Sequence, residues 1–155
     1  MGYNVIDLID KAINIAIKEK TLYENIGKEK CNIPSIKIMS KVLMQEVDKN
    51  IQYNECLKKE LDDLNPDEID FVIYDKMSFL INQFNKKVYV AEIINTREYL
   101  KFSLGFQKDV YSLLIDLQGR FVKSTHDTDT KTYEILSNMI NNKASHIAVL
   151  EKILK

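Results

Sequence analysis

The segment Tyr99–Leu117 constrains the fold more than any other, because its apolar residues recur at steps of three and four. That spacing places them on one face of an α-helix. The residues on this face are Leu100, Ser103, Leu104, Gln107, Val110, Tyr111 and Leu114. Gln107 is an amide at the centre of a stripe that should point into a core. A buried amide without a hydrogen bond costs roughly 1–3 kcal/mol, so we expect the chain to supply a partner for Gln107.

Three further segments show the same periodicity, and together the four predict an all-α protein. The expected helices cover residues 4–26, 34–64, 96–122 and 132–155, with Gly27 as the stop signal of the first. The chain has only four glycines and two prolines in 155 residues, which favours long helices over a turn-rich fold. This length fits one compact domain, predicted to span residues 1–155.

The connection over residues 65–95 is the part that the pattern determines least. Its first half is apolar enough for a short helix or a pair of helices. The residues available for burial there are Phe71, Ile73, Met77, Leu80, Ile81 and Phe84. The segment Val88–Ile94 resembles a strand, but a lone strand has nothing to pair with, so we expect an extended or helical connection. Two helical hairpins joined by a long crossover indicate a four-helix bundle.

Charge and hydropathy exclude several classes of function. The net charge of -1 offers no basic surface for nucleic acid. No apolar run approaches the roughly 20 residues that span a bilayer. The first residues carry no basic segment typical of a signal peptide, and Ile6 stands where a myristoylation motif requires Ser or Thr. We therefore expect a cytoplasmic protein that binds neither nucleic acid nor membranes.

The common catalytic and metal-binding motifs are not found in the sequence. Cys31 and Cys56 are far apart, which excludes a site that needs four clustered thiolates, and we expect two free thiols, one in a loop and one on a helix. A redox pair stays open on spacing alone. There is no Gly-rich phosphate loop, no G-x-S-x-G and no H-E-x-x-H.

The two predicted hairpins resemble each other at their centres. The four local sequences are AINIAIKEKTLYENIG, LMQEVDKNIQYNECL, SLGFQKDVYSLLIDL and MINNKASHIAVLEKIL. The residues at corresponding positions are Ala16, Val47 and Asn50 in the first hairpin and Gln107, Lys143 and His146 in the second. In each hairpin the last two are three residues apart, which places them on one helix face.

This arrangement resembles the ferritin-like, rubrerythrin-type di-iron family. In that family, helices one and three each supply a Glu, and helices two and four each supply Glu-x-x-His. Carboxylate and imidazole ligands converging from four helices are what two irons need. The resemblance covers the four long helices but not residues 65–95. It implies a ferritin-like four-helix bundle.

The ligands of that family are largely missing when the motif is carried over position by position. Ala16 and Val47 have no ligand atoms, Asn50 and Gln107 are amides, and Lys143 would bring a positive charge. His146 is the one good metal ligand among the six. We therefore expect a vestigial site without metal, cofactor or catalytic residues. In an alternative interpretation, the motif is shifted along the helices, so that other carboxylates bind iron. The candidate carboxylates are Glu19, Glu46, Asp48 and Asp109, of which Glu19 is the most interesting.

The polar residues of the predicted interior should contact one another. A buried lysine needs a counter-charge, so Lys143 is expected to pair with an inward acid, Glu19 first, or to extend outward. All four candidate acids, Glu19 included, are expected to be solvated or to partner Lys143. His146 should be hydrogen-bonded, with Gln107, Asn50 or Tyr23 as its partner.

Two hypotheses of function follow from the resemblance. The first is a non-catalytic binding, assembly or regulatory module, forming a homodimer through an apolar helix face. The second is a di-iron oxidoreductase that reduces peroxide or oxygen with an unconventional ligand set. A helical small-molecule binder is a third possibility, but packed cores tolerate few voids, so Ala16 and Val47 should come with a filled centre.

Overall fold

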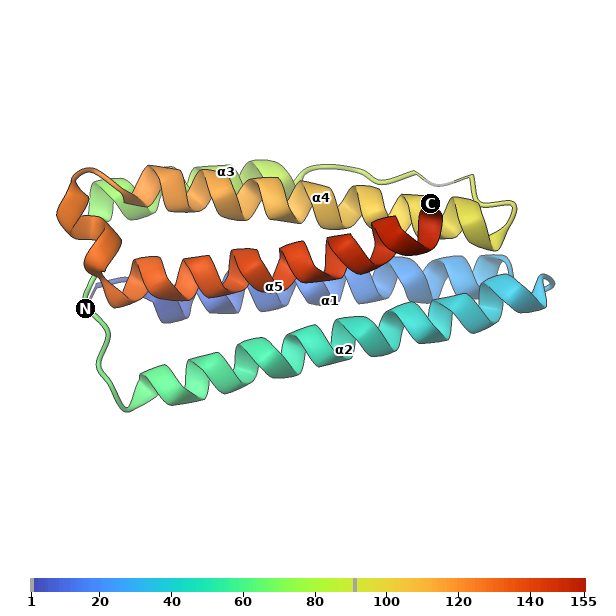
Figure 1. Cartoon of the computed structure of the whole chain (residues 1–155), viewed down its shortest axis with the longest axis horizontal. Helices are drawn as coiled ribbons and strands as arrows, with labels where there is room; N and C mark the ends of the chain where they lie inside the picture. Colours follow the sequence, from blue (N-terminus) through green and yellow to red (C-terminus); the bar gives the residue numbers. More distant parts are fainter. Residues whose placement is uncertain (1, 91) are drawn as a thin grey trace. The chain divides into compact units, whose positions relative to one another are not determined.

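The chain is all-helical in the residues that the computed structural model describes, 2–90 and 92–155 (Figure 1). Within them it forms five α-helices, one 3-10 helix and no strand. The helices are α1 (Val5–Glu29), α2 (Pro34–Asp62), α3 (Phe71–Asn85), α4 (Thr96–Phe121), η1 (Thr125–Asp129) and α5 (Lys131–Leu154). The all-α class is thus confirmed, and each of the four predicted long helices corresponds to α1, α2, α4 or α5. None of the described helices is long and apolar enough to cross a membrane.

The prediction that Gly27 ends the first helix is wrong, because α1 continues to Glu29. A Cβ atom added to Gly27 would lie 2.9 Å from both Cβ and Oγ of Ser40 on α2. Real Cβ atoms do not come that close to other heavy atoms, so the missing side chain is what allows the two helices to approach here. The glycine therefore serves packing rather than termination.

Local sequence signals explain where the other helices begin. Pro34 occupies the first turn of α2, where its missing N–H costs nothing. The Asp70 side chain caps α3 by accepting hydrogen bonds from the N–H groups of Val72 and Ile73. Thr130 caps α5 in the same way, with its hydroxyl accepting from the N–H of Tyr133.

The described residues divide into two compact units. The first unit contains the described N-terminal residues up to Val5, residues 66–90, and Leu100–Lys155. The second contains Ile6–Asn65 and Glu92–Tyr99. A single domain over residues 1–155 stays a prediction.

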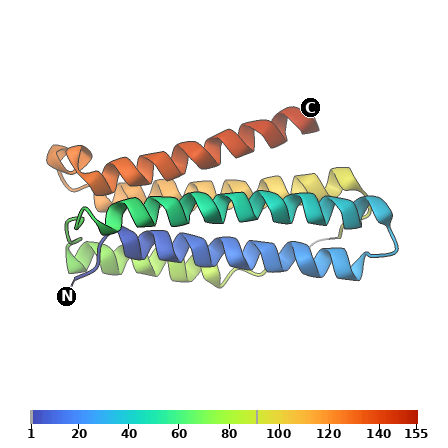
Figure 2. The same ribbon diagram turned by 90° about the horizontal axis from the view of Figure 1, so that it is seen from below.

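In the second unit, α1 and α2 form an antiparallel hairpin (Figure 2). Two ion pairs join them, Lys20 with Asp48 and Lys58 with Asp10, each at 2.8 Å. As the residue number rises along α1 it falls along α2, which fixes the antiparallel direction. Exposed ion pairs contribute at most about 1 kcal/mol, so burial of apolar side chains must supply most of the stability. The buried apolar residues of this hairpin include Ile9, Ile13, Ala16, Tyr23, Ile36, Leu43, Val47 and Leu61.

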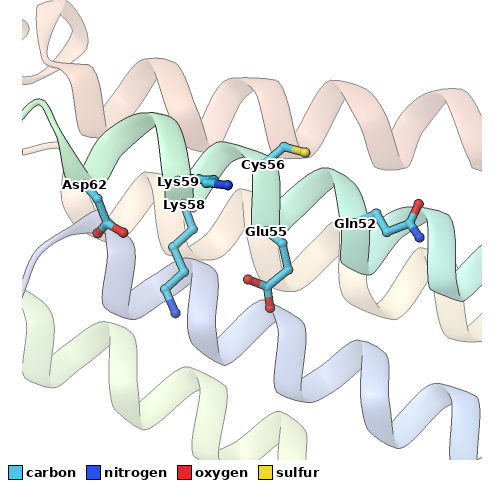
Figure 3. Close-up of a pocket in the computed structure, with 6 residues that line it drawn as sticks. All are labelled: Gln52, Glu55, Cys56, Lys58, Lys59 and Asp62. Carbon is cyan, nitrogen blue, oxygen red and sulfur yellow. The ribbon is translucent and has the colours of Figure 1, made fainter.

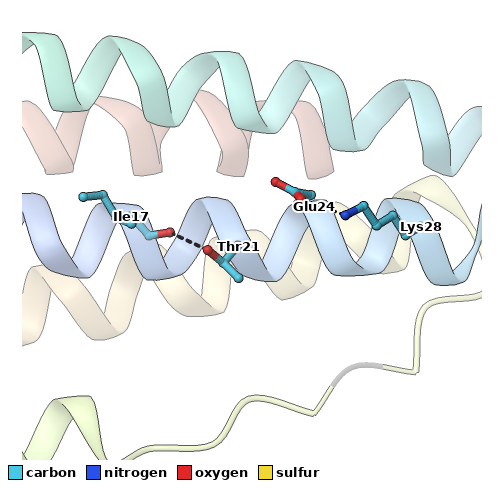
Figure 4. Close-up of polar contacts among 4 residues, drawn as sticks. All are labelled: Ile17, Thr21, Glu24 and Lys28. Atoms are coloured by element: carbon cyan, nitrogen blue, oxygen red, sulfur yellow. Dashed lines mark hydrogen bonds and ion pairs between the residues drawn. The ribbon is translucent and has the colours of Figure 1, made fainter.

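One side of α1 carries contacts typical of a helix surface (Figure 4). Lys28 Nζ lies 2.9 Å from Glu24 Oε1 one turn earlier. This hydrogen bond and the lysine charge lower the pKa of Glu24. The Thr21 hydroxyl donates to the Ile17 carbonyl oxygen at 3.1 Å. Both contacts lie within α1.

In the first unit, α4 and α5 form the second antiparallel hairpin. Near the connecting turn, Gln118 Nε2 donates to Ser137 Oγ at 2.7 Å and to the Tyr133 carbonyl oxygen at 3.3 Å. The last turn of α5 exposes Ile153 together with Glu151 and Lys152. The buried apolar residues of this hairpin are Phe106, Val110, Leu113, Leu114, Leu117, Phe121, Ile135, Leu136, Met139, Ile140 and Ile147.

The connection contains one helix, α3, followed by an extended segment. The buried face of α3 consists of Ile73, Tyr74, Met77, Ile81 and Phe84. Phe71 was expected to be buried with them, which is wrong because it lies on the opposite face of the helix and is exposed. No strand forms in the described part of Val88–Ile94, so an extended connection is confirmed there. Residue 91 of this segment lies outside the described residues.

Tyr89 packs the extended segment against α4. Its ring contacts Phe106 at 4.9 Å and Phe102 at 6.3 Å between centroids. Its hydroxyl donates to Asp109 Oδ2 at 2.7 Å. Burial, and then the hydrogen bond and the charge of Asp109, raise the pKa of Tyr89.

A Tyr89→Phe variant should test this contact. We expect it to lower the free energy of unfolding at neutral pH by about 1 kcal/mol, the usual net value of one hydrogen bond. Because folding raises the pKa of Tyr89, the contribution of its phenol is complete below the unfolded value of about 10 and is lost as pH rises above it. Urea unfolding at neutral pH and near pH 11 should therefore show a smaller alkaline loss for the variant. Equal alkaline losses would contradict the assignment.

Candidate functional site

The centre of the second hairpin holds a buried pair, Gln107 on α4 and Lys143 on α5. Each side chain is only 7% exposed. Lys143 Nζ donates a hydrogen bond to Gln107 Oε1 at 2.6 Å. The expectation that Gln107 would have a partner is confirmed, and the partner is this lysine. The alternative that Lys143 extends outward is wrong, because the antiparallel register of α4 and α5 brings its ammonium group to the amide.

The chemistry of this pair is that of a hydrogen-bonded cation. An ammonium group has three donors and no lone pair, so it cannot ligate a metal. A hydrogen bond from a charged donor is stronger than one between neutral groups, and 2.6 Å is at the short end for such bonds. The amide oxygen of Gln107 is the acceptor of this bond. The pair thus places a lysine nitrogen and an amide, rather than two carboxylate ligands, inside the hairpin.

His146 follows Lys143 by three residues on α5 and is half-buried. A hydrogen bond from this histidine to Gln107, Asn50 or Tyr23 stays a prediction. The pairing of Lys143 with Glu19 also stays a prediction, because these residues belong to different units.

In the second unit, Glu19 and Tyr23 form a buried pair on α1. Glu19 is 4% exposed, and Tyr23 is almost completely buried. The Tyr23 hydroxyl donates to Glu19 Oε2 at 2.7 Å. The expectation of a solvated carboxylate is therefore wrong for Glu19, because the helix turns this residue inward on the same stripe as Ala16.

A second buried hydrogen bond, between two hydroxyl groups, lies next to the Glu19–Tyr23 pair. The hydroxyls of Ser40 on α2 and Tyr99 on α4 form a buried hydrogen bond at 2.7 Å. The Tyr99 hydroxyl also lies 3.4 Å from the Tyr23 carbonyl oxygen, and the two tyrosine rings meet edge to face at 5.9 Å. Burial raises the pKa of Tyr99, although the hydrogen bond with Ser40 acts in the opposite direction. The chain of contacts runs from Glu19 through two tyrosines to Ser40.

Sequence reasoning did not find this chain of contacts as a unit. The spacing of four between Glu19 and Tyr23 signals that they share a helix face. Nothing comparable marks Ser40 and Tyr99, which are 59 residues apart.

The remaining predicted positions lie on α1 and α2. Ala16 and Val47 are buried, as apolar core residues. Asn50 is half-buried and accepts two hydrogen bonds from Asn54 Nδ2, at its carbonyl oxygen (3.1 Å) and at Oδ1 (3.0 Å). The Asn54 Oδ1 atom is buried without a hydrogen-bond partner. The two asparagines that interrupt the inner face of α2 therefore bond mainly to each other.

The alternative carboxylates do not gather into a ligand set. Glu46 is exposed and pairs with Lys49 at 3.1 Å. Asp48 pairs with Lys20, and Asp109 accepts from Tyr89. Within residues 2–90 and 92–155, no group of three or more His, Cys, Asp and Glu side chains could hold a metal ion.

A hollow of about 630 Å³ lies beside α2 (Figure 3). Its lining residues are Gln52, Glu55, Cys56, Lys58, Lys59 and Asp62. They come from about three turns of one helix, their charges have mixed signs, and Lys58 is already paired with Asp10. Cys56, like Cys31, is an exposed free thiol, which confirms the expectation of two free cysteines. The hollow shows no convergent arrangement of groups around a ligand.

Comparison of the chain with protein-family models, curated proteins and solved structures found no match.

Proposed function

We propose that this chain is a ferritin-like four-helix bundle without di-iron chemistry, acting in the cytoplasm as a non-catalytic binding, assembly or regulatory module. The observation that carries the proposal is the buried hydrogen bond from Lys143 to Gln107. The family resemblance places a glutamate at each of these positions. The chain has a neutral amide and a cation there instead.

The replacement of two glutamates by Gln107 and Lys143 changes the charge of the site, and this change supports the loss of metal. Two carboxylates provide the negative charge that attracts iron, whereas an ammonium group at the same place repels it. Ala16 and Val47, both buried and apolar, support the same reading for the first hairpin.

A di-iron oxidoreductase with an unconventional ligand set is the second candidate, and the burial of Glu19 favours it. Glu46, its other expected ligand, is exposed and bound to Lys49, which weighs against it.

Iron content should separate the two candidates. We would purify the full chain without chelators, incubate it with ferrous iron under anaerobic conditions, remove unbound metal and determine iron by elemental analysis. We expect well below one iron per chain, because the inward positions lack carboxylates. A His146→Ala variant, which removes the one good ligand among the six motif positions, should give the same low value. About two irons per chain, the stoichiometry of a di-iron site, lost in His146→Ala, would overturn the proposal.

A further inference from the structure

The outer face of α3 is more apolar than a solvated helix surface should be. Phe71, Val72 and Phe79 are 70%, 55% and 60% exposed. Residues 71, 72, 75, 76 and 79 fall on one side of the helix, opposite the buried face formed by residues such as Met77 and Ile81. This group of five, here called the α3 outer face, combines three exposed large apolar side chains with the charged residues Asp75 and Lys76.

The size of the apolar surface fits contact with another protein surface. A whole aromatic side chain presents about 200 Å², so the two phenylalanines leave roughly 250 Å² of ring surface uncovered. One partner of a standard interface contributes roughly 800 Å² in all, with an apolar centre and a polar rim. The two rings and Val72 thus supply an apolar centre of suitable size, and the surrounding polar residues of α3 can supply the rim.

The order of the residues on this face gives it internal symmetry. Apolar residues stand at both ends, and the exposed charges of Asp75 and Lys76 stand in the middle. At a rise of 1.5 Å per residue, Val72 and Phe79 each lie about 5 Å along the helix axis from the point midway between Asp75 and Lys76. A two-fold axis through that point therefore exchanges Val72 with Phe79 and Asp75 with Lys76. Phe71 then falls opposite Leu80, which is half-buried.

We infer that the α3 outer face binds the same face of a second copy of this chain, with the two α3 helices antiparallel. In this arrangement Asp75 of each chain lies opposite Lys76 of the other, which makes two equivalent ion pairs. Val72 of each chain lies opposite Phe79 of the other. A two-fold dimer requires such a self-complementary patch. The inference does not depend on the iron content, since the face lies outside the four motif-bearing helices.

Sedimentation equilibrium of the full chain, with reductant to keep Cys31 and Cys56 as thiols, tests this surface. We expect a monomer–dimer equilibrium with a dissociation constant of roughly 100 µM or lower. Phe79→Glu should raise the dissociation constant by about 30-fold or more, as for a central interface residue. Ile38→Glu, at an equally exposed apolar residue of α2, is the matched control and should leave the constant within about twofold. Circular dichroism would check that both variants remain helical.

A charge exchange tests the antiparallel register. Asp75→Lys alone and Lys76→Asp alone each oppose like charges twice, and each should weaken the dimer about five- to tenfold. The double variant Asp75→Lys/Lys76→Asp restores both ion pairs with reversed direction and should return to near the original constant. A monomer at all concentrations, or a dimer insensitive to Phe79→Glu, would overturn the inference. Binding of Phe79 to another protein while the chain stays monomeric would do the same.

Discussion

Replacing Gln107 with Leu is expected to lower the free energy of unfolding by about 2–3 kcal/mol, the range for a lost hydrogen bond to a charged group. Leucine has a similar size and a high helix propensity, so neither packing nor local structure accounts for such a loss. The cause is the loss of the buried hydrogen bond from Lys143 Nζ to Gln107 Oε1, which is 2.6 Å long. Urea unfolding followed by circular dichroism at neutral pH measures the change.

Two comparisons make this prediction specific. Gln45→Leu introduces the same side chain at an exposed position of α2, and its effect should stay within about 0.5 kcal/mol. Gln107→Glu keeps an acceptor for Lys143 and adds an opposite charge, so it should destabilise less than Gln107→Leu. Equal effects of Gln107→Leu and Gln45→Leu would show that the buried hydrogen bond contributes nothing measurable.

Removing the phenol of Tyr23 is expected to have the second largest effect. Tyr23→Phe keeps the ring, which is almost fully buried and packs against Tyr99, but removes the hydroxyl that donates to Glu19. A buried carboxylate that loses a donor keeps its desolvation cost, so we expect a loss of about 2 kcal/mol in the same urea experiment.

The control and the coupling test for Tyr23 use the same substitution chemistry. Tyr53→Phe removes a hydroxyl from a half-buried tyrosine of α2 and should change the free energy of unfolding by less than about 0.5 kcal/mol. In the double variant Tyr23→Phe/Glu19→Gln, the charge that needed the donor is also gone. The combined loss should therefore be smaller than the sum of the two single losses. Strict additivity would indicate that the two groups do not interact.

The long helices could be predicted from the sequence because helical periodicity is a local property. The stripe around Gln107 is visible in a window of about 15 residues. The structure buries Ser103, Gln107, Val110 and Leu114 of this stripe and leaves its other three residues half-buried. The same local pattern could not predict which residue is the hydrogen-bond partner of Gln107. That Lys143 and not another residue reaches Gln107 depends on the register between α4 and α5, which is set by packing along two whole helices.

Two sequence-based predictions were wrong because the same type of residue occurs in two different structural positions. Glycine commonly follows a helix end, yet Gly27 stands inside α1 because Ser40 leaves no room for a side chain. Phe71 was expected in the core because it is apolar, yet the buried face of α3 starts two residues later. In each case the deciding contact comes from a distant part of the chain, which a local pattern does not contain.

The buried lysine also has a consequence for the life of the protein in a cell. A cation that is part of the polypeptide is present as soon as the chain is translated, whereas a metal has to be imported and delivered. If Lys143 supplies the positive charge of this interior, folding needs no such supply. The protein should then persist through iron starvation and withstand strong chelators, with its thermal midpoint unchanged when a chelator is added.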